Sequence, residues 1–458
     1  MTAADRRFFG HPRGLATLFL TELWERFSYY GGRALLILFM TASAAAGGLG
    51  FEVAKAAAIY GLYTAMVYLL SLPGGWLADR ILGQRKAVLW GGVLIGLGNF
   101  SLAAPGLSFF YLGLMLIVAG TGLLKPNVSV MVGQLYTPGD ARRDAGFSIF
   151  YMGINLGAFL APLACGYLGQ RINWHLGFAL AGVGMALGLA QYVAGWRHLG
   201  KAGLDPVRPA SEEEGERQKR QLRRGLAAAA VVATLTATGV VSVTAQGLSD
   251  ALGLVLLLAV AAFFAWAMFL GNWTTIERKR LIVVGVLFAA STLFFSLFEQ
   301  AGSTLNLFAE RSMAKSILGF SFPASWMQSV NALFIIALAP VFAWVWVKLG
   351  PREPSSPAKF VLGLAGAGLG FVVLAVAASL AAGGTQVSPM WLVSVYLLHT
   401  VGELCLSPVG LSAMTKLAPE RVGGLLMGVW FLSIAVGNYL GGRVASLYEA
   451  LPLPSLFT

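Results

Sequence analysis

The chain has 458 residues, of which 57% are hydrophobic and only 11% are charged. Soluble domains are about a quarter charged, so too few polar side chains remain here to cover a water-soluble globule. This composition excludes a soluble enzyme, a secreted disulfide scaffold and a disordered chain, and it indicates that lipid is the main solvent. The net charge of +12 would suggest nucleic acid in a soluble protein; in a membrane protein it predicts basic cytoplasmic loops, and we expect no nucleic-acid partner.

Hydrophobic segments long enough to cross a bilayer follow one another along the chain. Clusters of Gly, Pro and charged residues, such as 104–106 and 350–352, separate them. Strand-like alternation is absent, so we predict an all-α membrane protein rather than a barrel. The thirteen expected spans are 14–40, 52–78, 86–104, 108–136, 143–170, 174–197, 225–246, 251–272, 281–311, 322–348, 359–382, 389–417 and 421–447.

Lys and Arg side chains are divided unequally between the two sets of loops that these spans define. Most of the 32 Lys and Arg residues fall in the set that shares a side with the N-terminus. Because cytoplasmic loops of membrane proteins collect Lys and Arg, we expect a cytoplasmic N-terminus in a multi-pass protein of the cell inner membrane.

A polar, basic segment at 197–224 divides the first six spans from the remaining seven. Two helical blocks joined by a polar linker are typical of transporters built from internal repeats. A surface-lying amphipathic helix is an alternative for part of the linker. We expect an N-terminal six-helix bundle (1–198), a cytoplasmic linker (199–224), an extra transmembrane helix pair (225–272) and a C-terminal bundle (273–458).

The first predicted span carries ionisable side chains, each of which is costly in lipid unless it faces a cavity or a partner. Spacings of three and four residues place Glu22 and Arg26 on one face, and Tyr29, Tyr30 and Arg33 continue it. A carboxylate paired with arginine stays ionised, and it gains a proton once the arginine is drawn to a substrate carboxylate. The stripe therefore predicts proton–substrate coupling; a buried ion-pair network that fixes helix packing is the alternative.

Three further charges lie inside later spans: Lys125 beside the helix-kinking Pro126, and Glu299 and Glu403 in the second block. With the two arginines of the first span, they predict a cavity that has one basic and one acidic wall. A zwitterion with an amine at one end and a carboxylate at the other fits such a field. His399 lies one helical turn before Glu403 and would be placed to share its proton, although a packing histidine is the favoured interpretation.

Uncharged polar and aromatic residues inside the spans are weaker signals, and core packing is the favoured interpretation of any single one. They are Tyr63, Tyr68, Asn155, Asn331, Trp430 and Asn438. Cys165 and Cys405 lie in apolar segments, and the four histidines form no ligand cluster. A Gly-x-x-x-x-Gly-Lys-Ser/Thr loop is absent as well. We therefore expect no metal, no cofactor and no enzymatic activity.

Gly75-Trp76-Leu77-Ala78-Asp79-Arg80, in the expected loop between the second and third spans, resembles a loop motif of the major facilitator superfamily. Five further motifs are together specific: Glu22-x-x-Glu25-Arg26-Phe27-x-Tyr29-Tyr30, Lys125-Pro126-Asn127, the stretch Phe147–Gly157, Phe298-Glu299-Gln300, and Glu403 followed by Ser407-Pro408. With them the chain resembles the bacterial branch of the proton-dependent oligopeptide transporter family, within the major facilitator superfamily.

The resemblance implies two six-helix bundles with an extra helix pair between them, and proton-coupled symport of di- and tripeptides into the cytoplasm by alternating access. The partners would be small peptides, protons and the lipid bilayer, and we expect a monomer. The family has twelve core helices, whereas this chain ends after the eleventh, so we expect the last core helix to be missing.

The resemblance also assigns roles by position. Proton coupling would involve Glu22, Glu25, Arg26 and Glu299. The outer gate would be Arg33 with Glu299, and the inner gate Lys125 with Glu403. Substrate would be bound by Arg26, Tyr29, Tyr30, Arg33, Tyr63, Lys125, Asn155, Asn331, Glu403, Ser407 and Trp430.

The same fold could carry another small substrate, such as nitrate, an amino acid or a drug. Glu403 argues against an anion, because an acid in the pocket repels it. A membrane enzyme or a scaffold is the remaining alternative.

Overall fold

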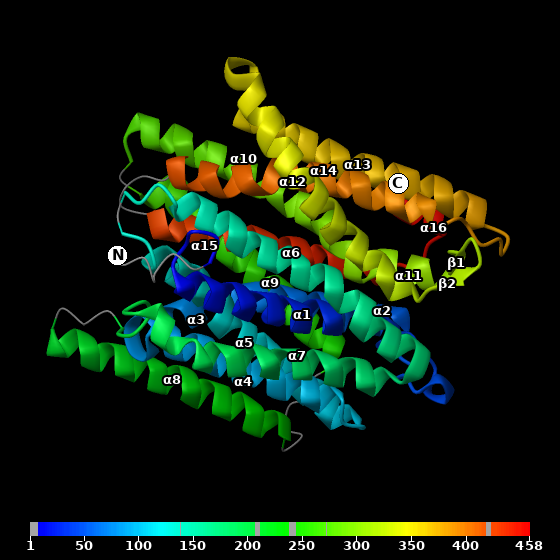
Figure 1. Cartoon of the computed structure of the whole chain (residues 1–458), viewed down its shortest axis with the longest axis horizontal. Helices are drawn as coiled ribbons and strands as arrows, with labels where there is room; N and C mark the ends of the chain where they lie inside the picture. Colours follow the sequence, from blue (N-terminus) through cyan, green and yellow to red (C-terminus); the bar gives the residue numbers. More distant parts are fainter. Residues whose placement is uncertain (1–7, 138, 207–210, 238–243, 272, 418–422) are drawn as a thin grey trace.

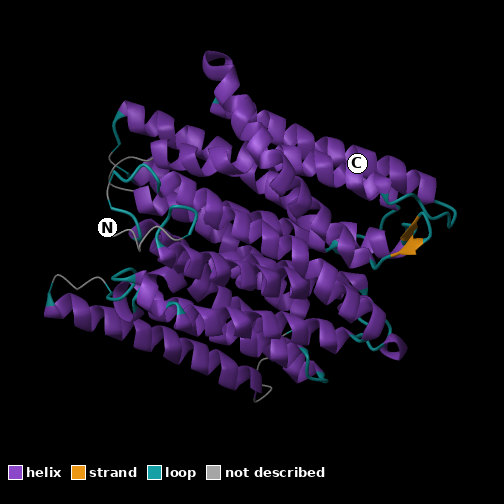
Figure 2. Ribbon diagram, viewed as in Figure 1, coloured by secondary structure: helices purple, strands orange, loops and turns teal. Residues whose placement is uncertain are grey.

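The computed structural model describes residues 8–137, 139–206, 211–237, 244–271, 273–417 and 423–458. Within these ranges the chain is helical apart from one short hairpin, β1 (Ser316–Ile317) and β2 (Phe320–Ser321) (Figure 2). The first block contains α1 (Arg13–Thr41), α2 (Val53–Leu69), α3 (Ser71–Leu77), α4 (Gln84–Leu102), α5 (Leu107–Gln134), α6 (Arg143–Tyr167) and α7 (Trp174–Ala194). Two helices follow, α8 (Glu212–Ala237) and α9 (Ala245–Ala265). The second block contains α10 (Thr275–Phe298), α11 (Thr304–Arg311), α12 (Gln328–Leu349), α13 (Ser356–Ala381), α14 (Met390–Leu417), α15 (Gly423–Ala445) and α16 (Leu453–Phe457).

The all-α architecture is confirmed. Ten helices of the described ranges are long and apolar enough to cross a membrane. In Figure 1, α10, α12, α13 and α14 lie on one side of the molecule and α1, α4, α5 and α7 on the other. The two blocks meet where α2 packs on α15 and where α6 packs on α12. Cys165 and Cys405 are buried free thiols in this packing.

Helix breaks differ from the sequence prediction in two places. The second span bends between α2 and α3 and continues as a π turn to Leu82, so the motif expected in a loop is helical there. Only Gly83 separates it from α4, at φ +78°, a conformation that favours glycine. The span expected at 281–311 is interrupted by a 3₁₀ turn, Glu299–Gly302, where a Cβ on Gly302 would collide with the Tyr60 hydroxyl.

α8 runs from Glu212 to Ala237, so a helix begins inside the segment 199–224 that the sequence assigns to the linker. Its first turn contains Glu212, Glu213 and Glu214, and acidic side chains there stabilise a helix N-terminus. The second part of the span expected at 225–246 includes residues 238–243, which lie outside the described ranges.

Glycines let the helices of the first block approach closely. A Cβ at Gly74 on α3 would collide with the backbone carbonyl of Gly122 on α5. We expect Gly74→Ala to lower the free energy of unfolding by about 1–3 kcal/mol, because backbone atoms must shift to accept the methyl group. The melting temperature in detergent measures this. Gly368→Ala on α13 is the control, because a Cβ there meets no atom within 4 Å; equal melting temperatures for both variants would contradict the prediction.

Candidate functional site

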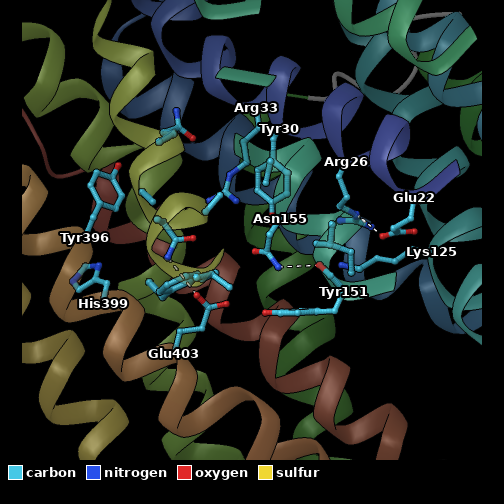
Figure 3. A pocket seen from close by; sticks show the side chains of 18 of the residues that line it. Glu22, Arg26, Tyr30, Arg33, Lys125, Tyr151, Asn155, Tyr396, His399 and Glu403 are labelled. Atoms are coloured by element: carbon cyan, nitrogen blue, oxygen red, sulfur yellow. Dashed lines mark hydrogen bonds and ion pairs between the residues drawn. The ribbon is translucent and has the colours of Figure 1, made fainter. Parts of the chain in front are cut away.

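A cavity of about 250 Å³ lies between the two blocks, where α1, α5 and α6 face α12 and α14 (Figure 3). Most of the predicted charged residues meet there although they come from distant parts of the chain. Of the residues predicted at the site, the cavity is lined by Glu22, Arg26, Tyr30, Arg33, Lys125, Asn155, Asn331 and Glu403.

The polar face of α1 forms one wall of this cavity. Glu22, Arg26, Tyr30 and Arg33 follow at spacings of four, four and three residues, as expected for one face of a helix. Arg26 Nε lies 2.7 Å from Glu22 Oε1 and 2.7 Å from Glu25 Oε2. All three side chains are buried, so each carboxylate depends on this guanidinium for its charge balance.

Glu22 and Glu25 also keep oxygens that the described residues leave without a hydrogen bond, namely Glu22 Oε2 and both oxygens of Glu25, of which Oε2 has only the ion-pair contact with Arg26. A buried carboxylate oxygen without a donor is costly, and protonation of that oxygen would remove part of the cost. The proton-coupling role of Glu22 and Arg26 stays a prediction.

Arg33 connects the two blocks. Its Nη2 lies 2.7 Å from Glu299 Oε2 and donates to the Glu299 backbone carbonyl at 3.3 Å. Its Nε donates to the Tyr60 hydroxyl of α2 at 2.8 Å. The predicted pair of Arg33 and Glu299 is thus in contact, but Tyr60 was missed, since nothing in its local sequence distinguishes it from a packing tyrosine.

Lys125 and Glu403, the predicted inner-gate pair, are held by different partners in this structure. Lys125 Nζ lies 3.7 Å from the centre of the Tyr68 ring, a cation–π contact. Glu403 Oε2 instead accepts a hydrogen bond from Asn331 Nδ2 at 3.3 Å, and Asn331 also donates to Thr400 at 2.9 Å. Figure 3 shows Lys125 and Glu403 on opposite sides of the cavity, so their pairing stays a prediction for another conformation.

Some predicted residues lie behind the cavity wall. Tyr29 stacks on Tyr63 with ring centres 6.3 Å apart, and Trp430 is 4% exposed and packs against Phe295. The Ser407 hydroxyl is buried without a hydrogen-bond partner among the described residues. The substrate-binding role of these residues stays a prediction. Glu25 and Glu299 do not line the cavity but contact the lining residues Arg26 and Arg33, and their proton-coupling role also stays a prediction.

His399 lines the cavity but does not share a proton with Glu403 in this structure. Its ring stacks on Phe371 at 5.5 Å, and neither ring nitrogen makes a hydrogen bond with a described residue. A Cβ on Gly370 would lie 2.5 Å from the ring, which shows how closely the imidazole packs against α13. This geometry matches the packing interpretation.

Several lining residues were not predicted at the site: Tyr68, Ser129, Tyr151, Ile154, Ala158, Phe298, Ala301, Gln328, Ala332, Ile335, Tyr396 and His399. Helical spacing offered a signal for two of them. Tyr151 lies one turn before Asn155, and its carbonyl accepts the Asn155 amide at 2.9 Å. Tyr396 lies two turns before Glu403 on α14.

Side-chain hydrogen bonds join the two blocks at the end of the molecule where α1 and α6 finish, near β1 and β2 (Figure 1). Asn306 Nδ2 donates to the Ala34 carbonyl at 2.9 Å. The Ser329 hydroxyl donates to the Phe159 carbonyl at 2.7 Å, and the Trp326 indole to the Leu163 carbonyl at 3.0 Å. Together with the pair of Arg33 and Glu299, they hold the two blocks in contact at this end.

A charged cavity between two blocks of membrane-crossing helices defines a membrane transporter. Residues 85–454 match the model of the POT family, and the chain belongs to this family. It is 44% identical to the peptide transporter YePEPT of Yersinia enterocolitica, in an alignment that covers 100% of this chain and 92% of the relative. It is 38% identical to the di-/tripeptide transporter of Lactococcus lactis subsp. cremoris, with 98% and 92% covered.

A crystal structure of a peptide transporter POT in complex with sulfate is 45% identical and superposes with a TM-score of 0.93, covering 99% of this chain and 93% of that one. The predicted family and fold are therefore confirmed, and the chain is a multi-pass membrane protein of a transporter family rather than an enzyme.

Proposed function

We propose that this protein carries di- and tripeptides into the cytoplasm together with protons, by alternating access. The observation that carries the proposal is the cavity, in which Arg26, Arg33 and Lys125 come from the first block and Glu403 from the second. A short peptide is a zwitterion whose two ends match these charges. Relatives that align over nearly the whole chain are named as peptide and di-/tripeptide transporters.

Each end of the peptide would have its own binding groups. The ammonium group would bind Glu403, which Asn331 already orients by a hydrogen bond. The carboxylate would bind the cations of the opposite wall, and arginine suits this role because its guanidinium can bind a carboxylate through two parallel hydrogen bonds. Tyr30 and Asn155 line the space between and would contact the peptide backbone.

Proton coupling would follow from competition for Arg26. While Arg26 contacts both carboxylates, its positive charge favours the ionised form of Glu22 and Glu25. A peptide carboxylate that draws Arg26 away leaves two acids side by side in a buried site, and one of them then takes up a proton. Peptide and proton therefore bind together, and Glu299 would be released in the same way when Arg33 changes partner.

Alternating access would be a movement of residues 1–198 against residues 273–458, with 199–224 as the linker and 225–272 as an accessory pair. The contacts of Arg33 would form the outer gate and are closed here. Lys125 and Glu403 would form the inner gate; in this conformation Lys125 contacts Tyr68 and Glu403 accepts from Asn331. Because both walls of the cavity belong to one chain, a monomer would be sufficient for transport.

Orientation in the inner membrane can be tested with introduced cysteines, since Cys165 and Cys405 are buried. With a cytoplasmic N-terminus, Lys201 faces the cytoplasm and Thr385 the outside, and both are exposed. We expect an impermeant maleimide to label Thr385→Cys in intact cells and Lys201→Cys only after permeabilisation. The reverse pattern would show the opposite orientation.

Uptake by proteoliposomes with an alkaline lumen tests the cargo. We expect labelled dialanine to accumulate, with competition by unlabelled di- and tripeptides but not by nitrate, single amino acids or drugs. Competition by nitrate alone would support the same fold with a different substrate. Binding of peptide without accumulation would contradict transport and support a scaffold.

A further inference from the structure

A second contact between the two blocks lies beyond the pair of Arg33 and Glu299, at the end of α6. Here α6 continues as a π turn, Leu168–Ile172, which contains the half-buried Gln170. π turns place a side chain differently from a regular helix and are frequent at functional sites. The Gln170 side chain points across the boundary to two separate segments of the second block, α11 and the 3₁₀ turn Ala324–Met327.

The Gln170 carboxamide uses both of its ends in this contact. Its Nε2 donates to Glu310 Oε2 at 2.9 Å, and its Oε1 accepts from the backbone N–H of Ser325 at 3.0 Å. Lys315 holds Glu310 in place, because its Nζ lies 2.6 Å from Glu310 Oε1 and donates to the Glu310 carbonyl at 3.1 Å. The acceptor on Glu310 and the donor on Ser325 therefore match the amide in one orientation only.

The surrounding surfaces fit equally closely. A Cβ on Gly166, one turn before Gln170, would collide with the Ser325 hydroxyl. Arg171 donates to the Ser321 hydroxyl of β2 at 2.5 Å. Gln170 thus lies at the centre of a region where the first block meets the hairpin and both of its flanking segments.

We propose that Gln170 is a positioning residue for the transport cycle, an amide clasp that holds the outer side of the cavity closed by binding Glu310 and Ser325 at once. The role of this clasp in a transport cycle rests on the proposed function. Because the bonds of Gln170 run from one block to the other, they must break whenever the cavity opens outward. A carboxamide is required, since a carboxylate cannot donate to Glu310 and would add a like charge beside it.

The test measures the separation of the blocks rather than transport. Spin labels at Ala44→Cys and Thr385→Cys, both exposed and on opposite blocks at this end, report outward opening by double electron–electron resonance in nanodiscs without peptide. Gln170→Glu is expected to shift the ratio of closed to open molecules about tenfold toward the longer distance. The matched control is Gln246→Glu, an exposed amide that donates to Asp250 within α9 and joins no blocks.

A reciprocal exchange separates a clasp from a general packing role. Gln170→Glu combined with Glu310→Gln restores one amide and one carboxylate with their roles reversed, and we expect the short distance to return. Unchanged distances in folded Gln170→Glu, or no recovery in the exchange, would overturn the proposal. If Gln170→Glu does not fold, the same distances are measured in Gln170→Met. We expect more molecules with the longer distance, and a distribution equal to that of the unsubstituted protein would overturn the proposal. A failure to transport peptides would instead refute the proposed function and leave these distances unaffected.

Discussion

Glu403→Gln is expected to raise the KM for dialanine uptake at least about thirtyfold, because a buried charge contact to the peptide ammonium is worth about 2 kcal/mol or more. Glutamine keeps the volume and can still bind Asn331, so the substitution removes the negative charge and little else. Glu403 is half-buried on α14, and among the described lining residues it is the acid that the second block contributes, so no other described lining carboxylate on that wall replaces it.

The measurement is initial uptake by proteoliposomes over a range of peptide concentrations. Glu449→Gln serves as the control, because Glu449 pairs with Arg311 on the exposed surface away from the cavity, and its uptake should equal that of the unsubstituted protein. A Glu403→Gln protein with an unchanged KM would show that the peptide ammonium binds elsewhere.

Replacement of both Glu22 and Glu25 by glutamine is expected to abolish accumulation driven by a pH gradient while peptide exchange between the two sides continues. Both acids contact Arg26, so the double variant removes the groups that would take up the proton but leaves the arginine for the peptide carboxylate. Accumulation requires energy from the proton gradient, whereas exchange of labelled for unlabelled peptide requires none.

Gradient-driven uptake and counterflow are measured on the same vesicles. Glu52→Gln is the control in the first block. Glu52 is the exposed residue that precedes α2, and its side chain makes no capping hydrogen bond to that helix. Loss of both activities together would indicate that the acids fix the structure of α1, which is the alternative that the sequence leaves open. Retention of both would place coupling elsewhere.

The sequence predicts the site well where the signal is local. A charged residue in an apolar helix must face a cavity or a partner, and helical spacing places Glu22, Arg26 and Arg33 on one face. Tyr29 and Tyr30 show the limit of that argument. Adjacent residues point about 100° apart on a helix, and only Tyr30 reaches the cavity while Tyr29 turns to Tyr63.

What the sequence does not predict depends on contacts between distant segments. The helix after α10 is interrupted where Gly302 lies against Tyr60 of α2. The sequence around Gly302 and the sequence around Tyr60 do not show that these two residues meet. Tyr68, which the sequence marks only as a weak signal, lines the cavity, and its ring contacts the Lys125 ammonium group. Lys125 and Glu403 have separate partners, Tyr68 and Asn331, and their positions in the sequence do not show which partner each side chain takes.

If peptide and proton move together, dialanine that enters a vesicle must bring protons into its lumen, and the luminal pH shows this. Proteoliposomes that contain a pH-sensitive dye are prepared with equal pH on both sides, and dialanine is added outside. We predict that the lumen becomes acidic as the peptide enters, that glycerol in place of peptide causes no change, and that the variant with glutamine at positions 22 and 25 lets peptide equilibrate without acidification. Entry of labelled dialanine into vesicles of the unsubstituted protein with no change in luminal pH would contradict coupled transport of peptide and proton.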